Sequence, residues 1–433
     1  MKMLTRDKKN ALIERFRSSK AGDQTGGNGA KPRKRHAARA RFEDFEAYER
    51  IQIQRQASKR LGIGNPFFRE HEVRAGGTSR IDGVDCVNFS NYDYLGLNGD
   101  PRVTAAAEQA IADYGTSVSA SRIVSGERPI HRELERAIAD LYQADDALTF
   151  VSGHATNVAT IGHLFGPRDL VVHDALIHNS ALVGAELSGA KRRMFPHNDW
   201  EALDRLLSEQ RHQVDRVLIV IEGLYSMDGD TPDMARAIEI KKRHGAFLMV
   251  DEAHALGVLG DRGRGTWEAQ GIDPAEVDIW MGTMSKTLSS CGGYIAGNTA
   301  LIEMLRYGAP GFVYSVGLAP PLAAAALASL AILRDEPERV ARLQTNGRHF
   351  LDAAKARGIN TGDSEGYCVT PAILGSSIKA ANCSNAMLEQ GINVQPIIYP
   401  AVEERAARLR FFISAEHTKE QIDMALDRLQ AWL

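Results

Sequence analysis

The sequence predicts an α/β fold in which a mostly parallel central sheet is covered by helices on both faces. From about residue 100 onward, apolar runs of strand length alternate with segments of helical periodicity. The runs are apolar on both faces, which is typical of strands buried in a parallel sheet. After about residue 319 the pattern changes to helices followed by short strands. This change predicts a smaller α+β domain at the C-terminus.

The same pattern divides the chain of 433 residues into four parts. Residues 1–41 hold 13 Lys/Arg against 3 Asp/Glu and are rich in glycine, so we expect a basic, disordered arm. An N-terminal segment over 42–97 follows. Residues 98–318 form the large domain, and residues 319–433 form the small one.

Small and ionisable side chains gather where the predicted strands end. Because ligands of such sheets bind beyond the carboxyl ends of the strands, these positions are the first candidates for a site. They are Gly153 and His154 after "ALTFVS", Ser226 after "VLIVIEGLY", Asp251 and His254 after "AFLMV", and Thr283, Ser285 and Lys286 after "VDIWMG".

The tetrapeptide Asp251-Glu252-Ala253-His254 also occurs in nucleotide-driven helicases. Such motors need a P-loop, G-x-x-x-x-G-K-[ST], whose backbone amides and lysine hold the phosphates. The chain contains no Gly-Lys dipeptide. The motor interpretation is therefore rejected, no nucleic acid partner is expected, and this strand end serves other chemistry.

Lys286 lies in "GTMSKTLSSCGG", among hydroxyl residues and glycines that could hold a phosphate. One interpretation is a solvated surface lysine in a polar loop, which is the usual place for lysine. The other is chemistry with pyridoxal 5'-phosphate (PLP), in which a lysine forms a Schiff base and a carboxylate keeps the pyridine nitrogen protonated. The residues alone leave both interpretations open.

The order of short motifs resembles the α-oxoamine synthase family, the fold-type I PLP-dependent acyltransferases that include serine palmitoyltransferase. The resemblance runs from about Asn88 to the C-terminus. It rests on "NFSNYDYLGL", "SASRIVSGERPIHRELE", "FVSGHATNVA", "DALIHNSAL", "HNDW", "EGLYSMDGD", "VDEAHALGVLG", "GTMSKTLSSCGGYIAG", "FVYSVGLAPP" and "ARLRFFISAEHT". The resemblance makes residues 98–318 a PLP-binding domain.

The resemblance implies a role for each matched position around the cofactor ring. Lys286 would form the Schiff base and later move the substrate's α-proton. Asp251 would pair with the pyridine nitrogen, while His254 and Ser226 would contact the phenolic oxygen. His178 would stack on the open face of the ring, and we treat it with Lys286 as catalytic.

The phosphate site implied by the resemblance lies at the start of a helix. Gly153 and His154 would offer backbone amides there, although His154 departs from the aromatic or aliphatic residue that relatives often carry. Thr283 and Ser285 would complete the site, and Ser315 would reach in from a second subunit. A homodimer is therefore expected.

Substrate contacts are implied at two further positions. Arg410 matches the arginine that binds the amino-acid carboxylate, although Arg408 lies on the same strand face by the period of two. Ser121 takes the place where glycine-specific relatives tend to carry threonine. "PIIYP" replaces an Arg-Pro-Pro segment of bacterial serine palmitoyltransferases, so one carboxylate contact is expected to be missing.

The implied reaction is a decarboxylative condensation of a small amino acid with an acyl thioester to an α-amino ketone. We favour serine and a long-chain acyl group, carried by CoA or by an acyl carrier protein. Alanine or glycine in the same chemistry, as in aminooxononanoate synthase or aminoketobutyrate ligase, is the alternative. A PLP aminotransferase, which needs no acyl donor, is the candidate from another class.

Location and remaining partners follow from composition. Four scattered cysteines and no evident signal peptide favour a reducing cytoplasm, and the histidines show no metal-ligand spacing. Residues 307–333 carry no charge, but their prolines and alanines favour a loop and a buried helix over a membrane span. The basic arm could dock an acyl carrier protein or an anionic membrane surface, with a merely solvated arm as the alternative.

Overall fold

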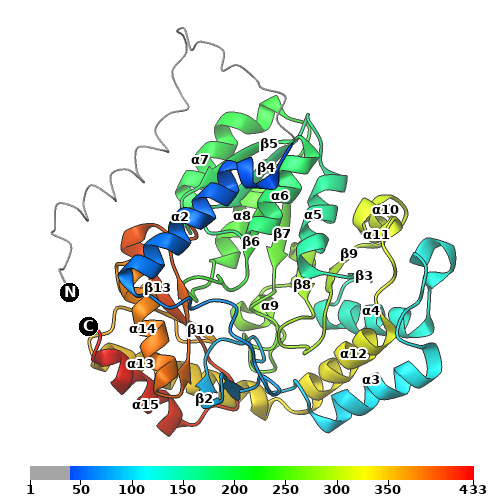
Figure 1. The fold of residues 1–433 in the computed structure, drawn as a ribbon. Helices are drawn as coiled ribbons and strands as arrows, with labels where there is room; N and C mark the ends of the chain where they lie inside the picture. Colours follow the sequence, from blue (N-terminus) through cyan, green and yellow to red (C-terminus); the bar gives the residue numbers. More distant parts are fainter. Residues whose placement is uncertain (1–39) are drawn as a thin grey trace. The chain divides into compact units, whose positions relative to one another are not determined.

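A computed structural model describes residues 40–433 of the chain (Figure 1). The expected disorder and docking role of the basic arm therefore lie almost entirely outside the described residues. The N-terminal unit, which ends at Arg60, contains a short 3-10 helix, η1 (Phe42–Asp44), and nearly all of helix α2 (Glu46–Leu61). Residues 61–433 form one compact unit by themselves, which holds everything described below.

A seven-stranded sheet with the order β3-β9-β8-β7-β6-β4-β5 forms the centre of this unit. All neighbouring pairs are parallel except the two made by β9, which runs antiparallel to β3 and β8. The predicted fold class is confirmed. The strands are β3 (Asp146–Phe150), β4 (Leu170–Asp174), β5 (Lys191–Phe195), β6 (Val217–Glu222), β7 (Phe247–Asp251), β8 (Ile279–Thr283) and β9 (Gly293–Gly297).

Each face of the sheet builds its own apolar core, because alternate residues of a strand point to opposite sides. In β6, Val217, Ile219 and Ile221 join one core, while Leu218 and Val220 join the other. This explains why the strands read as continuous apolar runs. The first core receives α3 (Pro101–Tyr114), α4 (Pro129–Tyr142), α7 (Trp200–Gln210), α8 (Met234–His244), α9 (Thr266–Gln270) and α12 (Pro320–Asp335), and the second receives α5 (Gly153–Leu164), α6 (Asn179–Ser188), α10 (Thr299–Gly308) and α11 (Pro310–Val313) (Figure 1).

The C-terminal part is the predicted smaller α+β region. Its antiparallel sheet has the order β10-β13-β12, and "RLRFFIS" supplies the central strand β13 (Arg408–Phe412). The boundary at residue 319 stays a prediction. The other elements are β10 (Val369–Ile373), β12 (Gln395–Ile397), α13 (Glu338–Ala356), α14 (Ser377–Glu389) and α15 (Lys419–Gln430).

A third sheet joins distant parts of the sequence. The hairpin of β1 (Thr78–Ile81) and β2 (Val84–Asn88) pairs through β2 with the parallel strand β11 (Ile392–Asn393). The N-terminal segment is therefore hydrogen-bonded to residues near the end of the chain.

The uncharged stretch over 307–333 is folded as expected. A loop leads from α11 into α12, which begins with Pro320-Pro321 and buries alanines such as Ala323 and Ala326. Proline is tolerated there because the first helical N–H groups need no intrahelical acceptor. Within residues 40–433, no helix has both the length and the apolar character that crossing a bilayer requires.

His197 joins two loops at the edge of the sheet. Its Nδ1 lies 2.8 Å from Oδ1 of Asp174 at the end of β4, and its Nε2 lies 2.8 Å from Oδ2 of Asp230 after β6. Burial lowers the pKa of His197, but the hydrogen bonds and charges of the two buried carboxylates outweigh burial and raise this pKa to about 10. The imidazolium therefore neutralises the pair.

We expect His197→Gln to lower the free energy of unfolding by about 3 kcal/mol at pH 6, because it leaves two buried carboxylates without a cation. Because the pKa of His197 is higher in the folded protein than in the unfolded chain, His197 stabilises the fold fully below the unfolded pKa of about 6.5. This stabilisation is lost as pH rises through the folded pKa of about 10. Urea unfolding of both proteins from pH 6 to 10 should therefore show a converging difference. A difference that is independent of pH would contradict the clamp.

Candidate active site

The predicted site residues converge at the carboxyl ends of three adjacent strands. Glu222 ends β6 and lies opposite Asp251, which ends β7, while Thr283 ends β8. Lys286 follows three residues after Thr283. Parallel register brings these ends to one edge of the sheet, where the strand rule places ligands.

Asp251 is buried in the middle of this edge. Its Oδ2 accepts a 2.9 Å hydrogen bond from Nδ2 of Asn157 in α5, and its Oδ1 accepts one of 3.0 Å from the backbone N–H of Ala253. These donors fix the carboxylate in one orientation. A buried acid held in this way can keep a cationic ring nitrogen protonated.

Lys286 lies in an environment that lowers the pKa of its ammonium group. Burial lowers the pKa of its ammonium group, while the charges of Asp251 and Glu222 pull the pKa back up. Its Nζ lies 5.5 Å from the ring centroid of Tyr92. The surface-lysine interpretation is therefore wrong, because a desolvated amine beside two carboxyl groups is suited to nucleophilic and base chemistry.

His254 is buried beside Lys286. Its Nδ1 lies 2.7 Å from the hydroxyl of Tyr94, and its ring stacks on Phe412 with a 6.3 Å centroid distance and an interplanar angle of 10°. Burial, and then the charges of Lys286 and Arg410, hold its pKa well below the ordinary value. His254 is therefore a neutral imidazole with one fixed orientation.

His178 caps the N-terminus of α6. Ser180 donates its backbone N–H to Nδ1 of His178 at 3.3 Å, and the Ser180 hydroxyl lies 2.7 Å from the same nitrogen. Burial lowers the pKa of His178, and Asp251 opposes this effect. The ring is thus neutral and held at the same strand edge.

The N-terminus of α5 faces the turn after β8. A Cβ atom on Gly153 would lie 2.7 Å from Oγ1 of Thr283, so only glycine allows this approach. Oγ1 of Thr283 lies 2.8 Å from Oγ of Ser285. The first N–H groups of a helix have no intrahelical acceptor, so the backbone of Gly153 and His154 can bind an anion. The His154 side chain is exposed.

The two candidate arginines of β13 have different partners. Arg408 is buried in an ion pair, with Nη1 2.6 Å from Oδ1 of Asp228. Arg410 donates from Nη1 to the backbone oxygen of Ser226 at 2.9 Å, and among the described residues it has no carboxylate partner and no acceptor for its buried Nε. Arg410 is therefore the one with free capacity for a substrate carboxylate.

Ser121 and Ser315 lie on two segments that are bonded to each other. Ala120 accepts a 3.0 Å backbone hydrogen bond from Gly317, which joins the two segments. Within residues 40–433, no hydrogen bond connects either serine to Lys286, Asp251 or His254. Neighbouring side chains are widely exposed, with Val124 80% and Tyr314 85% accessible.

Comparisons of the chain with known proteins agree with this geometry. The family model described as aminotransferase class I and II matches residues 84–429. The 8-amino-7-oxononanoate synthase of Symbiobacterium thermophilum is 39% identical over 368 residues, which cover 85% of this chain and 93% of that protein. The chain belongs to the α-oxoamine synthase family. Members of this family are fold-type I, PLP-dependent acyltransferases.

Solved structures of α-oxoamine synthases have the same fold. The serine palmitoyltransferase of S. paucimobilis, solved with PLP bound to myriocin, is 31% identical with a TM-score of 0.84 and covers 89% of this chain and 97% of that one. The 8-amino-7-oxononanoate synthase of Francisella tularensis is 26% identical with a TM-score of 0.69, covering 80% and 97%.

The residues of this α-oxoamine synthase fit PLP. The helix start at Gly153 and the hydroxyls of Thr283 and Ser285 suit a phosphate, and Asp251 and Lys286 suit the ring nitrogen and the aldehyde. Three buried atoms at this edge have no hydrogen-bond partner among residues 40–433. They are Oδ1 of Asn157, Oε1 of Glu222 and Nε of Arg410.

The sequence did not indicate Asn157 or Glu222. Asn157 lies four residues after Gly153, so both face the same side of α5, and this spacing is the signal that could have found it. Glu222 ends a buried strand just as Asp251 does. Tyr92 and Tyr94, which flank Lys286 and His254, belong to "NYDY", and the sequence alone indicates no role for them.

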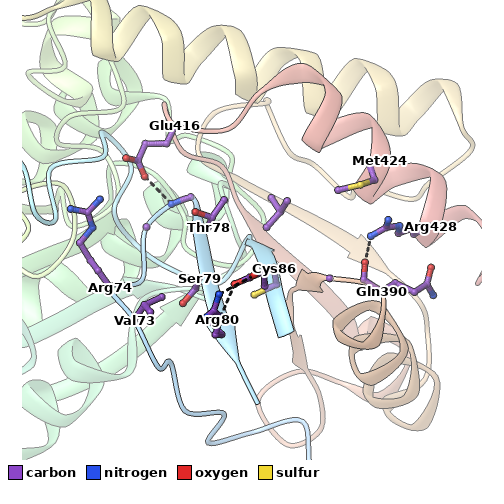
Figure 2. Close-up of a pocket in the computed structure, with 15 residues that line it drawn as sticks. Val73, Arg74, Thr78, Ser79, Arg80, Cys86, Gln390, Glu416, Met424 and Arg428 are labelled. Atoms are coloured by element: carbon purple, nitrogen blue, oxygen red, sulfur yellow. Dashed lines mark hydrogen bonds and ion pairs between the residues drawn. The ribbon is translucent and has the colours of Figure 1, made fainter. Parts of the chain in front are cut away.

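The cavity in Figure 2, with a volume of about 780 Å³, is a different place. It lies between the β1–β2 hairpin and α15, and none of the predicted site residues lines it. Its charged groups are already bonded: Arg80 pairs with Asp85 at 2.8 Å, Arg428 bonds the backbone oxygen of Gln390, and Glu416 accepts from Gly77 at 2.8 Å. Among residues 40–433, no group of three or more His, Cys, Asp or Glu side chains is arranged to bind a metal ion.

Glu222 is a second acid beside Asp251. Burial raises its pKa, the charge of Asp251 raises it further, and a 3.0 Å hydrogen bond from the Ser226 N–H partly opposes both, which leaves a pKa of about 8. The backbone N–H of His178 also donates to Glu222. At neutral pH Glu222 is largely protonated, and Asp251 lies beside a neutral neighbour.

We expect Glu222→Gln to gain stability over the wild type as pH rises. Because the pKa of Glu222 is higher in the folded protein, its contribution to stability is fully present below the unfolded pKa of about 4.5 and is lost as pH rises through the folded pKa of about 8. Glutamine cannot ionise, so the variant does not lose this contribution. The difference in the free energy of unfolding of the PLP-free proteins should grow by at most about 1.4 kcal/mol per pH unit between these values. Urea unfolding at pH 5.5, 7 and 8.5 measures it.

The exposed Glu389→Gln is the matched control, for which we expect no such growth. Parallel stability profiles for wild type and Glu222→Gln would show that Glu222 is ionised throughout.

Proposed function

We propose that the chain condenses alanine with the thioester of a seven-carbon dicarboxylic acid and releases 8-amino-7-oxononanoate, carbon dioxide and the thiol. This product carries an amino group on C8, a terminal methyl group and a ketone on C7. Alanine without its carboxylate supplies the C8–C9 fragment. C1–C7 therefore come from the acyl group, which must end in a free carboxylate.

The observation that carries the proposal is the free capacity of Arg410 beside a desolvated lysine. Arg410 contacts Ser226, and its charge acts on Lys286, His254 and His178. A guanidinium with open donors binds a carboxylate through two parallel hydrogen bonds. A substrate held in this way would place Cα within reach of Lys286.

Each residue then has a definite task. When bound, PLP would supply the electron sink for the bonds broken at Cα, and Lys286 is the residue that would hold its aldehyde carbon. Nζ of Lys286, whose pKa is lowered by burial, would take the Cα proton once the amino group of the substrate has replaced it on the cofactor. Asp251 holds the proton on the ring nitrogen, and His254 and Ser226 bond the phenolic oxygen. His178 covers the open face of the ring.

The phosphate site in this proposal spans two subunits. Gly153 and His154 offer backbone N–H groups, Thr283 and Ser285 offer hydroxyls, and Ser315 approaches from the partner of a homodimer. The wide exposure of Tyr314 and Val124 beside Ser315 and Ser121 supports a subunit contact at this surface.

Alanine replaces serine, which the sequence motifs favour, as the proposed amino acid. The curated relatives that resemble the chain at 34–39% identity carry the name 8-amino-7-oxononanoate synthase. The serine palmitoyltransferase structures keep serine with a long-chain acyl group as the reaction to test against it. The acyl carrier, CoA or an acyl carrier protein, is part of the same test.

The test is to supply the PLP-loaded protein with alanine, serine or glycine and then with a 6-carboxyhexanoyl group on CoA or on an acyl carrier protein, or with palmitoyl-CoA. We expect the visible absorbance of bound PLP to change with alanine, and carbon dioxide release to follow only with the dicarboxylic donor. Faster release with serine and palmitoyl-CoA would replace the proposed substrates. Conversion of the cofactor to its amine form without any acyl donor would mean an aminotransferase.

We expect Arg410→Lys to raise the KM for alanine about 10- to 100-fold with a smaller change in kcat, because lysine cannot bind a carboxylate through two parallel bonds. Arg408→Lys is the matched control on the same strand. It disturbs the ion pair with Asp228, so it should lower thermal stability and leave this KM unchanged. If the two variants exchanged these effects, Arg408 would be the carboxylate-binding residue.

A further inference from the structure

A buried asparagine connects two of the proposed cofactor residues. Nδ2 of Asn157 lies 2.9 Å from Oδ2 of Asp251 and 2.9 Å from Oγ of Ser180. Asn157 and Ser180 are each 1% exposed. Ser180 in turn contacts His178, so a continuous chain of hydrogen bonds runs from β7 through α5 to the start of α6.

The chemistry of these groups fixes the direction of every bond. A carboxylate only accepts, so the amide atom facing Asp251 must be the donating nitrogen, and its second N–H points to the Ser180 oxygen. The Ser180 hydroxyl, which accepts there, donates its own hydrogen to Nδ1 of His178 at 2.7 Å. The Ser180 backbone N–H donates to the same nitrogen. Nδ1 is therefore unprotonated.

We propose that Asn157 and Ser180 are positioning residues that lock the neutral ring of His178 with its proton on Nε2 and tie this ring to the carboxylate of Asp251. The proposal rests on the proposed PLP site. It links the carboxylate of Asp251 and the imidazole of His178 as one rigid unit, and it directs Nε2–H of His178 away from α6.

The surroundings of His178 are consistent with this locked state. Four charged or titratable groups act electrostatically on its imidazole: Asp251 of β7, His154 of α5, Arg410 of β13, and Lys286 of the loop after β8. Glu222 of β6 bonds the backbone N–H of His178 and not its ring. Three of these groups oppose a proton on the imidazole, and Asp251 alone of the four that act electrostatically favours it. The hydroxyl and the backbone N–H of Ser180, which both donate to Nδ1, also oppose a proton on the imidazole.

A double-mutant cycle on PLP affinity tests the link. PLP is removed from the purified enzyme and titrated back, with its dissociation constant followed by the visible absorbance. We expect Asn157→Ala and Ser180→Ala each to weaken PLP binding roughly tenfold. The double variant should also be weakened roughly tenfold, because either change alone breaks the same connection. Roughly hundredfold weakening, or unchanged single variants, would overturn the proposal.

The pH profile tests the ring. Loss of the Ser180 hydroxyl removes a donor that opposes protonation of Nδ1, so the acidic limb of kcat/KM should move to higher pH by roughly one unit in Ser180→Ala. An unmoved limb would overturn the assigned proton position. The PLP cycle is separate from the substrate question, because it gives its result even if alanine is not the amino acid.

Asn346→Ala is the matched control. Asn346 is also buried and donates two hydrogen bonds from Nδ2, to the backbone oxygens of Ser414 at 3.0 Å and His417 at 2.7 Å. It should lose stability but keep the wild-type PLP affinity and pH profile. A weakened PLP affinity in this variant would mean that loss of any buried amide disturbs the site, and the link would be unsupported.

Discussion

The arrangement of the site depends on keeping one carboxylate buried at the centre of a sheet. An ionised carboxylate removed from water is costly unless hydrogen bonds and a cation compensate it. Asp251 receives its compensation from three directions: the Ala253 N–H in its own strand-end turn, the amide of Asn157, and the charge of Lys286. The residues that stabilise Asp251 are therefore the ones that surround the proposed cofactor.

The topology of the sheet explains why these partners can meet. Parallel strands end at one edge, and the helices that follow them begin there, so α5 and α6 present their N-termini to Asp251. The antiparallel strand β9 adds a further constraint. Gly293 lets β9 pass close to Gly153 and Thr156, since a Cβ on Gly293 would lie 2.7 Å from Cα of Gly153, and this brings the turn after β8 against the start of α5.

Much of this could be predicted from the sequence, for physical reasons. Strands buried on both faces have an unmistakable apolar pattern, and Lys286, Asp251, His254 and His178 lie in motifs that follow those strands directly. The family and its cofactor were confirmed. Asn157 was missed because a buried asparagine reads as an ordinary polar helical residue until its two acceptors, from distant segments, are in place. The same holds for the pKa of Glu222, which depends on register with Asp251.

The sequence also could not distinguish Arg408 from Arg410, because strand periodicity gives both the same face. The ion pair with Asp228 decides between them, and that contact joins residues far apart in the chain. The proposed roles of Ser121 and Ser315 depend on a contact with a second subunit, and that contact is itself part of the proposal. The choice between serine and alanine lies beyond the motifs altogether, since both amino acids offer the same carboxylate and α-proton.

The pairing of β2 with β11 has a consequence for synthesis on the ribosome. The edge of β2 in the β1–β2 hairpin cannot pair until strand β11 has been synthesised, about 300 residues later in the chain. At the usual 5–20 residues per second, this interval lasts roughly 15–60 s. Throughout that time the nascent chain displays an unsatisfied strand edge, which is a template for pairing with other chains. Chaperone capture of the emerging polypeptide would be most valuable in this window.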